Sequence, residues 1–279
     1  MRLFAILLVL VLPLAGPVTA QTIEKIQETK TITFGFRTDA TPLSLADDAG
    51  NPGGYSTLIC ADLAREIAAL LEIPDLTAEF VPVDTGNRFD KVASGEIDLL
   101  CGAATITLSR RALVDFSIPT FVDGASVMVP RGGARSLQEL EGRKVGFRSE
   151  TTTEQAVKNS FGGAGLAIEE VRFTDHRAGS DALVAGEIDA YFADLSILLA
   201  FFINDRLDEN FVMPDNQLTL EKHGFALRRG DADFRLLVDT GLSRLYAKGK
   251  VQEAFVKAMP GAKPGAGLRA MFLMAPTLP

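Results

Sequence analysis

Apolar and polar residues alternate over residues 32–37, and this pattern predicts a β-strand that ends at Arg37. Farther along, apolar residues recur every three or four positions, as expected for a helix that begins at Ser56 or Thr57 and buries one face. Two more strands with a helix between them are predicted within residues 80–101. The order strand, helix, strand, helix, strand is typical of an open parallel sheet in an α/β fold.

A second run of elements begins after Phe121. An extended crossing is predicted at residues 126–130. After it, strands are predicted at residues 145–147, 170–173 and 188–192, and helices at residues 137–140, from 149–153 onward, at 180–185 and at 195–203. Both runs contain Gly-Glu-Ile-Asp between a helix and a strand, at residues 95–98 and 186–189. This short internal repeat indicates two similarly built lobes.

The last part of the chain differs from both runs. Its residue pattern predicts an extended segment at residues 224–227, helices at 234–246 and 251–259, and a loop-like tail from Pro260. We expect the chain to cross between the lobes twice, near residues 124–127 and 220–224. Such a double crossing forms a hinge.

The first twenty residues have the features of a cleaved Sec signal peptide. Met1-Arg2 supplies a positive start, residues 3–14 are apolar, and small residues lead to a cleavage site after Ala20. The apolar run is too short to span a bilayer, which disfavours the alternative of a retained membrane anchor. No cysteine lies near the cleavage site, so a lipid anchor is not indicated. The protein is therefore expected in the periplasm.

Composition narrows the choice of partners. The chain has 47% apolar residues, enough for a packed core, and a formal net charge of −8, which argues against nucleic acid or anionic membranes as partners. Export to an oxidising compartment favours a disulfide between Cys60 and Cys101, with two buried free thiols as the alternative. His176 and His223 lie far apart in sequence, so no structural zinc site is expected, and no motif indicates a cofactor.

Residues 97–111, with the sequence IDLLCGAATITLSRR, combine a buried strand with features of an anion site. Small residues at 102–104 leave the backbone accessible. Hydroxyl residues follow, and Thr107 is placed to cap a short helix carrying Arg110 and Arg111. Exposed amides and an arginine at a strand end suit a carboxylate. The alternative from these residues alone is an ordinary loop with solvated arginines.

Polar residues recur at the other predicted strand ends, where open α/β sheets bind ligands. The first lobe contributes Arg37, Thr85, Arg88 and residues 103–110, and the second contributes residues 149–152, His176 and Asp194. Taken singly, each has an ordinary explanation, such as a helix N-cap for Asp194. Their convergence indicates a cleft between two lobes.

The chain resembles the extracytoplasmic amino-acid-binding proteins of bacterial ABC importers, which form solute-binding protein family 3. Within this family it is most similar to the glutamate/aspartate-binding subgroup, from about Ile23 to the C-terminus. The motifs that carry the resemblance are FGFRTDATPLS, DTGNRFDKVASGEIDLLCG, VDFSIPTF, SETTTE, DHRAGSDALVAGEIDAYFAD and HGFALRRGDADFRLLVD.

The resemblance implies a type II periplasmic-binding-protein fold. Lobe 1 would comprise residues 21–125 and 223–279, and lobe 2 residues 126–222. The protein would be a monomer without catalytic activity. It would close on a free amino acid, preferably an acidic one, and deliver it to the membrane permease of an ABC importer.

The resemblance also assigns roles to individual residues. Arg110 and the Thr105 region would hold the ligand α-carboxylate, together with amides near Thr151 and Thr152, and Asp194 would bind the α-ammonium group. The ligand side chain would be surrounded by Arg37, Thr85, Arg88 and His176. A carboxylate in the ligand would raise the pKa of His176.

Two positions depart from the family pattern and leave alternatives open. Ala103 replaces a usual serine, and Glu150 replaces a small residue. Cyclohexadienyl dehydratases share this fold, and in such an enzyme Glu150 would act as a general acid. A receptor that serves a sensor kinase is a further alternative. If Glu150 neutralised one of the arginines, the site would also tolerate amides.

Overall fold

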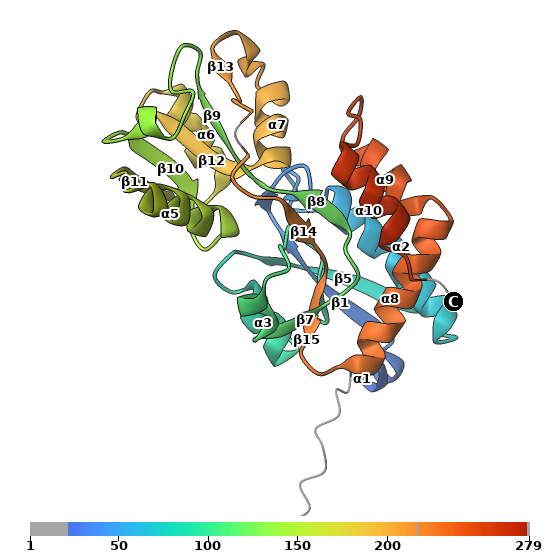
Figure 1. The fold of residues 1–279 in the computed structure, drawn as a ribbon. Coiled ribbons are helices and arrows are strands. Elements are labelled where there is room, and N and C mark those ends of the chain that lie inside the picture. The colour runs from blue at the N-terminus through green and yellow to red at the C-terminus, as the bar shows by residue number, and fades with distance from the viewer. Residues whose placement is uncertain (1–21, 216, 278–279) are drawn as a thin grey trace, which may run out of the picture.

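The computed structural model describes residues 22–215 and 217–277. The predicted signal peptide, residues 1–20, lies outside this part of the chain. Two lobes are visible in Figure 1, each built around a five-stranded sheet with helices packed against it. The helices described here are all too short or too polar to cross a membrane.

The sheet of the first lobe has the strand order β5-β1-β6-β15-β7. β1 (Thr31–Arg37) pairs in parallel with β5 (Thr77–Val83) and β6 (Leu99–Leu100). β15 (Ala226–Arg228) returns from the end of the chain and lies antiparallel between β6 and β7 (Val114–Phe116). The helices of this lobe are α1 (Thr22–Thr29), α2 (Tyr55–Leu70), α3 (Arg88–Ser94), α4 (Leu108–Arg111), α8 (Ala232–Ala247), α9 (Lys250–Ala258) and α10 (Ala266–Met274).

The sheet of the second lobe has the analogous order β11-β10-β12-β9-β13. Its three parallel strands are β11 (Glu169–Phe173), β10 (Lys144–Arg148) and β12 (Ala190–Asp194). Antiparallel strands complete it: β9 (Ala125–Pro130) and β13 (Phe211–Val212). The helices are α5 (Thr152–Ala164), α6 (His176–Val184) and α7 (Leu195–Asn204), with 3₁₀ turns at Gln138–Leu140 and Leu207–Glu209. The α/β class and the two sheet-containing lobes predicted from the sequence are thus confirmed.

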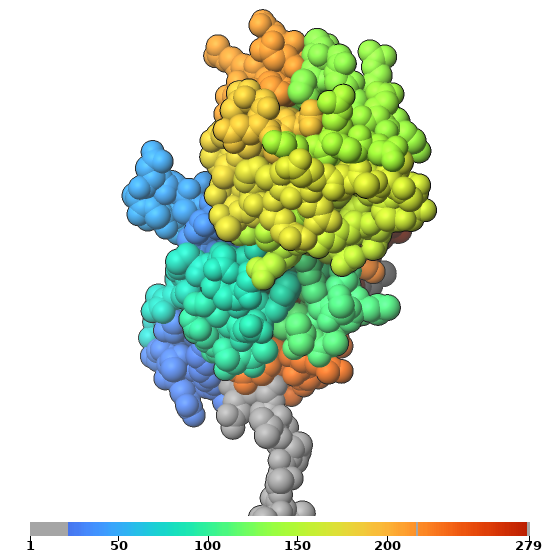
Figure 2. All heavy atoms as spheres, turned by 90° about the vertical axis from the view of Figure 1, so that its left-hand side faces the viewer, coloured from blue at the N-terminus to red at the C-terminus, as the bar shows by residue number. Residues whose placement is uncertain are grey.

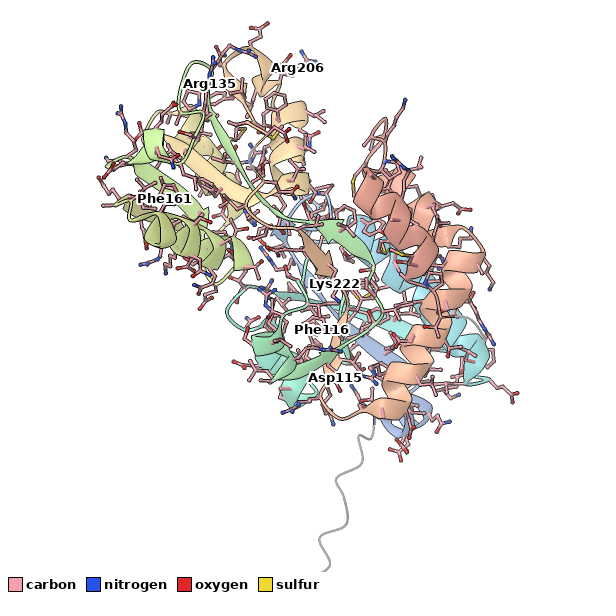
Figure 3. All side chains as sticks on the ribbon, viewed as in Figure 1. Asp115, Phe116, Arg135, Phe161, Arg206 and Lys222 are labelled. Atoms are coloured by element: carbon pink, nitrogen blue, oxygen red, sulfur yellow. A yellow bond between two sulfur atoms is a disulfide. The ribbon has the colours of Figure 1, made fainter. Side chains whose placement is uncertain are left out.

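Two short strands lie near the predicted crossings: one ends just before residues 124–127, and the other falls within residues 220–224. β8 (Phe121–Asp123) pairs antiparallel with β14 (Glu221–His223), and Lys222 of β14 is labelled between the lobes in Figure 3. We call this pair the hinge ribbon.

Several local predictions were wrong. The tail after Pro260 contains α10, because Leu268, Met271 and Phe272 bury one face of a helix against the core. α6 begins at His176, four residues earlier than predicted, since Asp175 caps it by accepting a hydrogen bond from the amide of Ala178.

A small three-stranded sheet follows β1 in the first lobe. Its strands are β2 (Asp39–Ala40), β3 (Ser44–Ala46) and β4 (Pro52–Gly53). Figure 2 shows this blue segment standing out from the first lobe beside the second. It therefore brings residues of the first lobe to the edge of the interlobe cleft.

Of the two alternatives that the sequence left open for Cys60 and Cys101, the structure has the disulfide. It ties α2 to the chain just after β6, and both cysteines are fully buried. The bridge therefore anchors the start of the Gly102–Arg111 turn to the core.

Replacing both cysteines with alanine should lower the free energy of unfolding by roughly 2–4 kcal/mol, because the cross-link restricts the unfolded chain. Urea denaturation followed by circular dichroism measures the loss. Wild-type protein in reductant should approach the double variant. An unchanged urea midpoint in the double variant would contradict this stabilising role.

Candidate functional site

A small enclosed cavity lies between the lobes at the ends of β1, β6 and β12. Its volume is about 20 Å³, and a cavity needs roughly 10–15 Å³ on this measure to hold one water molecule, so it is too small for an amino acid. Nine of the ten ligand-binding residues predicted from the sequence line it, together with Thr153 and Ile197: Arg37, Arg88, Ala103, Thr105, Arg110, Thr151, Thr152, His176 and Asp194. The tenth, Thr85, is buried outside the lining.

Arg110 is positioned by the capped turn that the sequence predicted. The Thr107 hydroxyl accepts a hydrogen bond from the backbone N–H of Arg110, and the Arg110 guanidinium donates to the carbonyl of Thr105 at 2.9 Å. The guanidinium also lies over the ring of Phe89, 5.2 Å from its centroid. Burial lowers its pKa to about 10, so Arg110 remains a cation at neutral pH.

Glu221, on the hinge ribbon, was not predicted as a cleft residue. One of its carboxylate oxygens accepts hydrogen bonds from the hydroxyls of Thr105 and Thr152, at 2.6 and 2.9 Å. The two hydroxyls, one from each lobe, are themselves 3.1 Å apart. Burial alone would raise the pKa of Glu221, but hydrogen bonds from Thr105, Thr219 and Thr152 outweigh it and lower the pKa. Glu221 is therefore a charged link between the lobes.

Asp39 and Arg148, also missed, form an ion pair across the cleft. Asp39 lies on β2 of the first lobe and Arg148 at the end of β10 in the second; the Arg148 Nε and an Asp39 oxygen are 2.7 Å apart. The other Asp39 oxygen accepts a hydrogen bond from Nε of Arg37, also at 2.7 Å. Burial opposes ionisation of Asp39, yet Arg37, His176 and Arg148 together lower its pKa to about 2.

Arg88 is the cation of the site that lacks an acidic partner. Its side chain is buried, and its guanidinium donates only to backbone carbonyls, of Ala103 at 3.3 Å and of Glu150 at 3.5 Å. Within residues 22–215 and 217–277 no carboxylate lies within ion-pair distance of it. Burial, followed by the nearby charges of Arg110 and Arg37, lowers its pKa well below the usual value.

His176 is buried at the start of α6, and its Nδ1 lies 3.0 Å from the hydroxyl of Tyr191. Burial, and then the positive charge of Arg37, lower its pKa to about 3. His176 is therefore neutral near physiological pH in this structure. That a ligand carboxylate would raise this pKa stays a prediction.

Asp194 occupies the N-cap position of α7, but its carboxylate makes no capping hydrogen bond. One oxygen accepts from the hydroxyl of Thr153 at 3.1 Å, and the other lies 3.8 Å from Nε2 of His223. Asp194 thus presents a carboxylate to the cavity, as predicted. Thr151 has a structural role, since its hydroxyl caps α5 by accepting from the amide of Glu154.

Glu150 does not neutralise an arginine. Its side chain is exposed, with a carboxylate oxygen close to Gly86 of the first lobe, and it forms no ion pair among the described residues. The four arginines of the cleft (Arg37, Arg88, Arg110 and Arg148) therefore face the carboxylates of Asp39, Asp194 and the hydrogen-bonded Glu221. A further acid, Asp123, lies beside Asp194, but burial and then the charge of Asp194 raise its pKa well above the usual value. An excess of positive charge remains in the cleft of an acidic chain.

Residues 32–260 match the family described as bacterial extracellular solute-binding proteins, family 3. The chain belongs to this family. Among its relatives is the L-glutamate/L-aspartate-binding protein of Pseudomonas aeruginosa, 28% identical over 95% of this chain and 90% of the relative.

Solved structures place this family-3 protein among type II periplasmic binding proteins. A solute receptor for L-cysteine from Neisseria gonorrhoeae has a TM-score of 0.75 and 25% identity, covering 87% of this chain and 97% of that receptor. An ancestral arginine-binding protein bound to arginine has a TM-score of 0.73 and 25% identity, covering 82% of this chain and 98% of that protein. Similar structures thus include receptors for amino acids of different charge.

The lowered pKa of Asp39 predicts a pH-dependent contribution to stability. Because this pKa falls from 3.8 to about 2 on folding, the stabilisation is present above about pH 4 and is lost as pH falls toward 2. The advantage of wild type over Asp39→Asn in urea unfolding should shrink over that window. Asp48→Asn, which removes an exposed carboxylate of the same segment, is the control and should leave the profile unchanged. A difference between wild type and Asp39→Asn that is constant from pH 6 to pH 2.5 would refute the assignment.

Proposed function

We propose that this protein is a periplasmic receptor that binds a free acidic amino acid, glutamate or aspartate, and delivers it to the permease of an ABC importer. Family membership supports amino-acid binding in general, and the glutamate/aspartate-binding relative supports the acidic class. The cysteine and arginine receptors with the same fold leave specificity to be argued from the cleft itself.

The observation that carries the acidic preference is Arg88, a buried cation without a carboxylate partner. An amino acid needs one cation and one carboxylate for its zwitterion, and Arg110 and Asp194 supply these. Arg37 already contacts Asp39. Because a buried unpaired charge is costly, the missing partner of Arg88 is best supplied by a side-chain carboxylate of the ligand. We assign Thr85 and His176 to the same end of the proposed site as Arg88.

Ligand entry requires the lobes to separate, because the present cavity is too small for an amino acid. We assign residues 21–125 and 223–279 to one moving lobe and 126–222 to the other, with the hinge ribbon between them. The ion pair between Asp39 and Arg148 and the hydrogen bonds of Glu221 then break and reform with each cycle.

The dehydratase alternative receives less support. A general acid must reach the substrate, and Glu150 is exposed outside the lining of the enclosed cavity. We therefore propose a monomeric receptor without catalytic activity. Turnover of prephenate or arogenate by the purified protein would reverse this conclusion.

Glutamate or aspartate should bind more tightly than glutamine or asparagine, and Arg88→Met should remove that preference. Losing one partner of a desolvated charge pair costs roughly 2–5 kcal/mol, or about 30- to 5,000-fold in affinity. Titration calorimetry measures both effects. Arg111→Met, which removes an exposed arginine of the same turn, is the matched control. Equal affinity of the wild type for glutamate and glutamine would overturn the acidic assignment.

Ligand should shift the population of molecules toward the closed form, since the proposed binding residues come from both lobes. Small-angle scattering should therefore show a smaller radius of gyration with saturating glutamate than without it. Arg148→Ala removes the interlobe ion pair, so this variant should be more open without ligand. A radius that is unchanged by ligand in Arg148→Ala would contradict hinge closure.

A further inference from the structure

Glu221 carries a buried carboxylate that contacts both lobes from the hinge ribbon. It precedes Lys222, which Figure 3 labels between the lobes. One of its oxygens accepts hydrogen bonds from the hydroxyls of Thr105, in the first lobe, and Thr152, in the second, at 2.6 and 2.9 Å. Its other oxygen accepts from the hydroxyl of Thr219 at 2.6 Å. Three hydroxyl groups therefore hold this carboxylate beside the ligand cleft.

Two of these hydroxyl groups belong to the proposed binding site. Thr105 and Thr152 line the enclosed cavity, and both were expected beside Arg110 at the ligand α-carboxylate. A hydroxyl group has a single hydrogen, so neither threonine can donate to a ligand while it donates to Glu221. In this closed form, whose cavity has no room for an amino acid, a carboxylate of the protein itself occupies both donors.

Glu221 also compensates the charge of Arg110. Burial lowers the pKa of the Arg110 guanidinium, and the negative charge of Glu221, followed by that of Asp194, opposes this effect. A ligand α-carboxylate would act on Arg110 in the same direction, because it carries the same charge. Glu221 therefore makes both interactions that are expected of the ligand: it accepts from the two threonines and it stabilises the arginine.

A groove outside the enclosed cavity gives the Glu221 side chain room to move. The groove has a volume of about 590 Å³, and its lining includes Thr105, Thr152 and Glu221. The two threonines line both the groove and the cavity, whereas Glu221 lines only the groove. The carboxylate thus approaches the threonines from the groove side and can withdraw in that direction without crossing the ligand position.

We propose that Glu221 is an internal competitor of the ligand α-carboxylate, an inference that rests on the proposed function. Before ligand binds, Glu221 holds the hydroxyls of Thr105 and Thr152 and favours closure. A bound amino acid takes over both hydroxyls, and Glu221 withdraws toward the groove. Because this contact stabilises only the closed form without ligand, it lowers the apparent affinity. The ion pair between Asp39 and Arg148 does not use these hydroxyls, so both closed forms keep it.

Glu221→Gln tests this role by titration calorimetry with L-glutamate. Hydroxyls donate more strongly to a carboxylate than to a neutral amide, so the variant competes less and should bind glutamate about 10-fold more tightly than wild type. Glu187→Gln removes an exposed carboxylate of the second lobe and should leave the affinity unchanged. Arg148→Ala breaks a contact of both closed forms and should not tighten binding. Unchanged or weaker binding by Glu221→Gln would overturn the inference.

A double-mutant cycle with Thr105→Val tests whether the hydroxyl is shared. In wild type the hydroxyl passes from Glu221 to the ligand, so its loss should change the glutamate affinity by less than about threefold. In the Glu221→Gln background the ligand is the stronger acceptor, and the same substitution should weaken binding about 10-fold. Equal effects of Thr105→Val in the two backgrounds would overturn the shared donor.

These outcomes are distinguishable from failure of the proposed function. If wild type binds neither glutamate nor aspartate, the acidic assignment fails, and the variants are compared with the amino acid found by a thermal-shift screen, since every amino acid has an α-carboxylate. A wild type that binds no amino acid would overturn both. Glu221→Asp keeps the charge but shortens the side chain, so it should also tighten binding; it replaces Glu221→Gln if thermal unfolding shows that variant to be unfolded.

Discussion

The excess of buried positive charge in the cleft is the constraint on which the rest of the structure depends. Three arginines, Arg37, Arg88 and Arg110, line a cavity of about 20 Å³, and desolvation makes each of them costly unless an anion is near. Asp39 stabilises Arg37, and it also pairs with Arg148 across the cleft. Arg88 remains, held by two carbonyls and by the ring of Phe89. The side-chain carboxylate of the proposed ligand would complete this charge distribution.

The same groups hold the lobes together. Asp39 reaches the second lobe because the short sheet β2–β4 extends past the edge of the first, and Glu221 receives one threonine hydroxyl from each lobe. Both carboxylates thus link charge compensation to lobe closure. Opening the cleft exposes these ion pairs and hydrogen bonds to water, where surface ion pairs contribute little. If the lobes move as proposed, closure without ligand would depend on a balance of small free-energy terms, and ligand binding would shift that balance toward the closed form.

The alternation of strands and helices and the capped turn before Arg110 were predictable, because both depend on neighbours in sequence. The predicted strand ends then identified nine of the residues that line the cavity. Asp39, Arg148 and Glu221 were missed because their partners lie far away: 109 residues separate Asp39 from Arg148, and 116 separate Thr105 from Glu221. α10 was missed because glycine and proline before it suggested a loop.

The proposed site has residues from both lobes, and these would contact both the α-ammonium group and the carboxylates of the ligand. Arg88 and Arg110 belong to elements α3 and α4 of the first lobe, whereas Asp194 ends β12 of the second. A ligand that contacted only the arginines would bind the open and closed forms alike and could not shift the population. A carboxylate ligand with an amino group at Asp194 contacts both lobes only when they are closed. Differential binding of this kind requires contacts from both lobes, which Arg88 and Arg110 on one lobe and Asp194 on the other would supply.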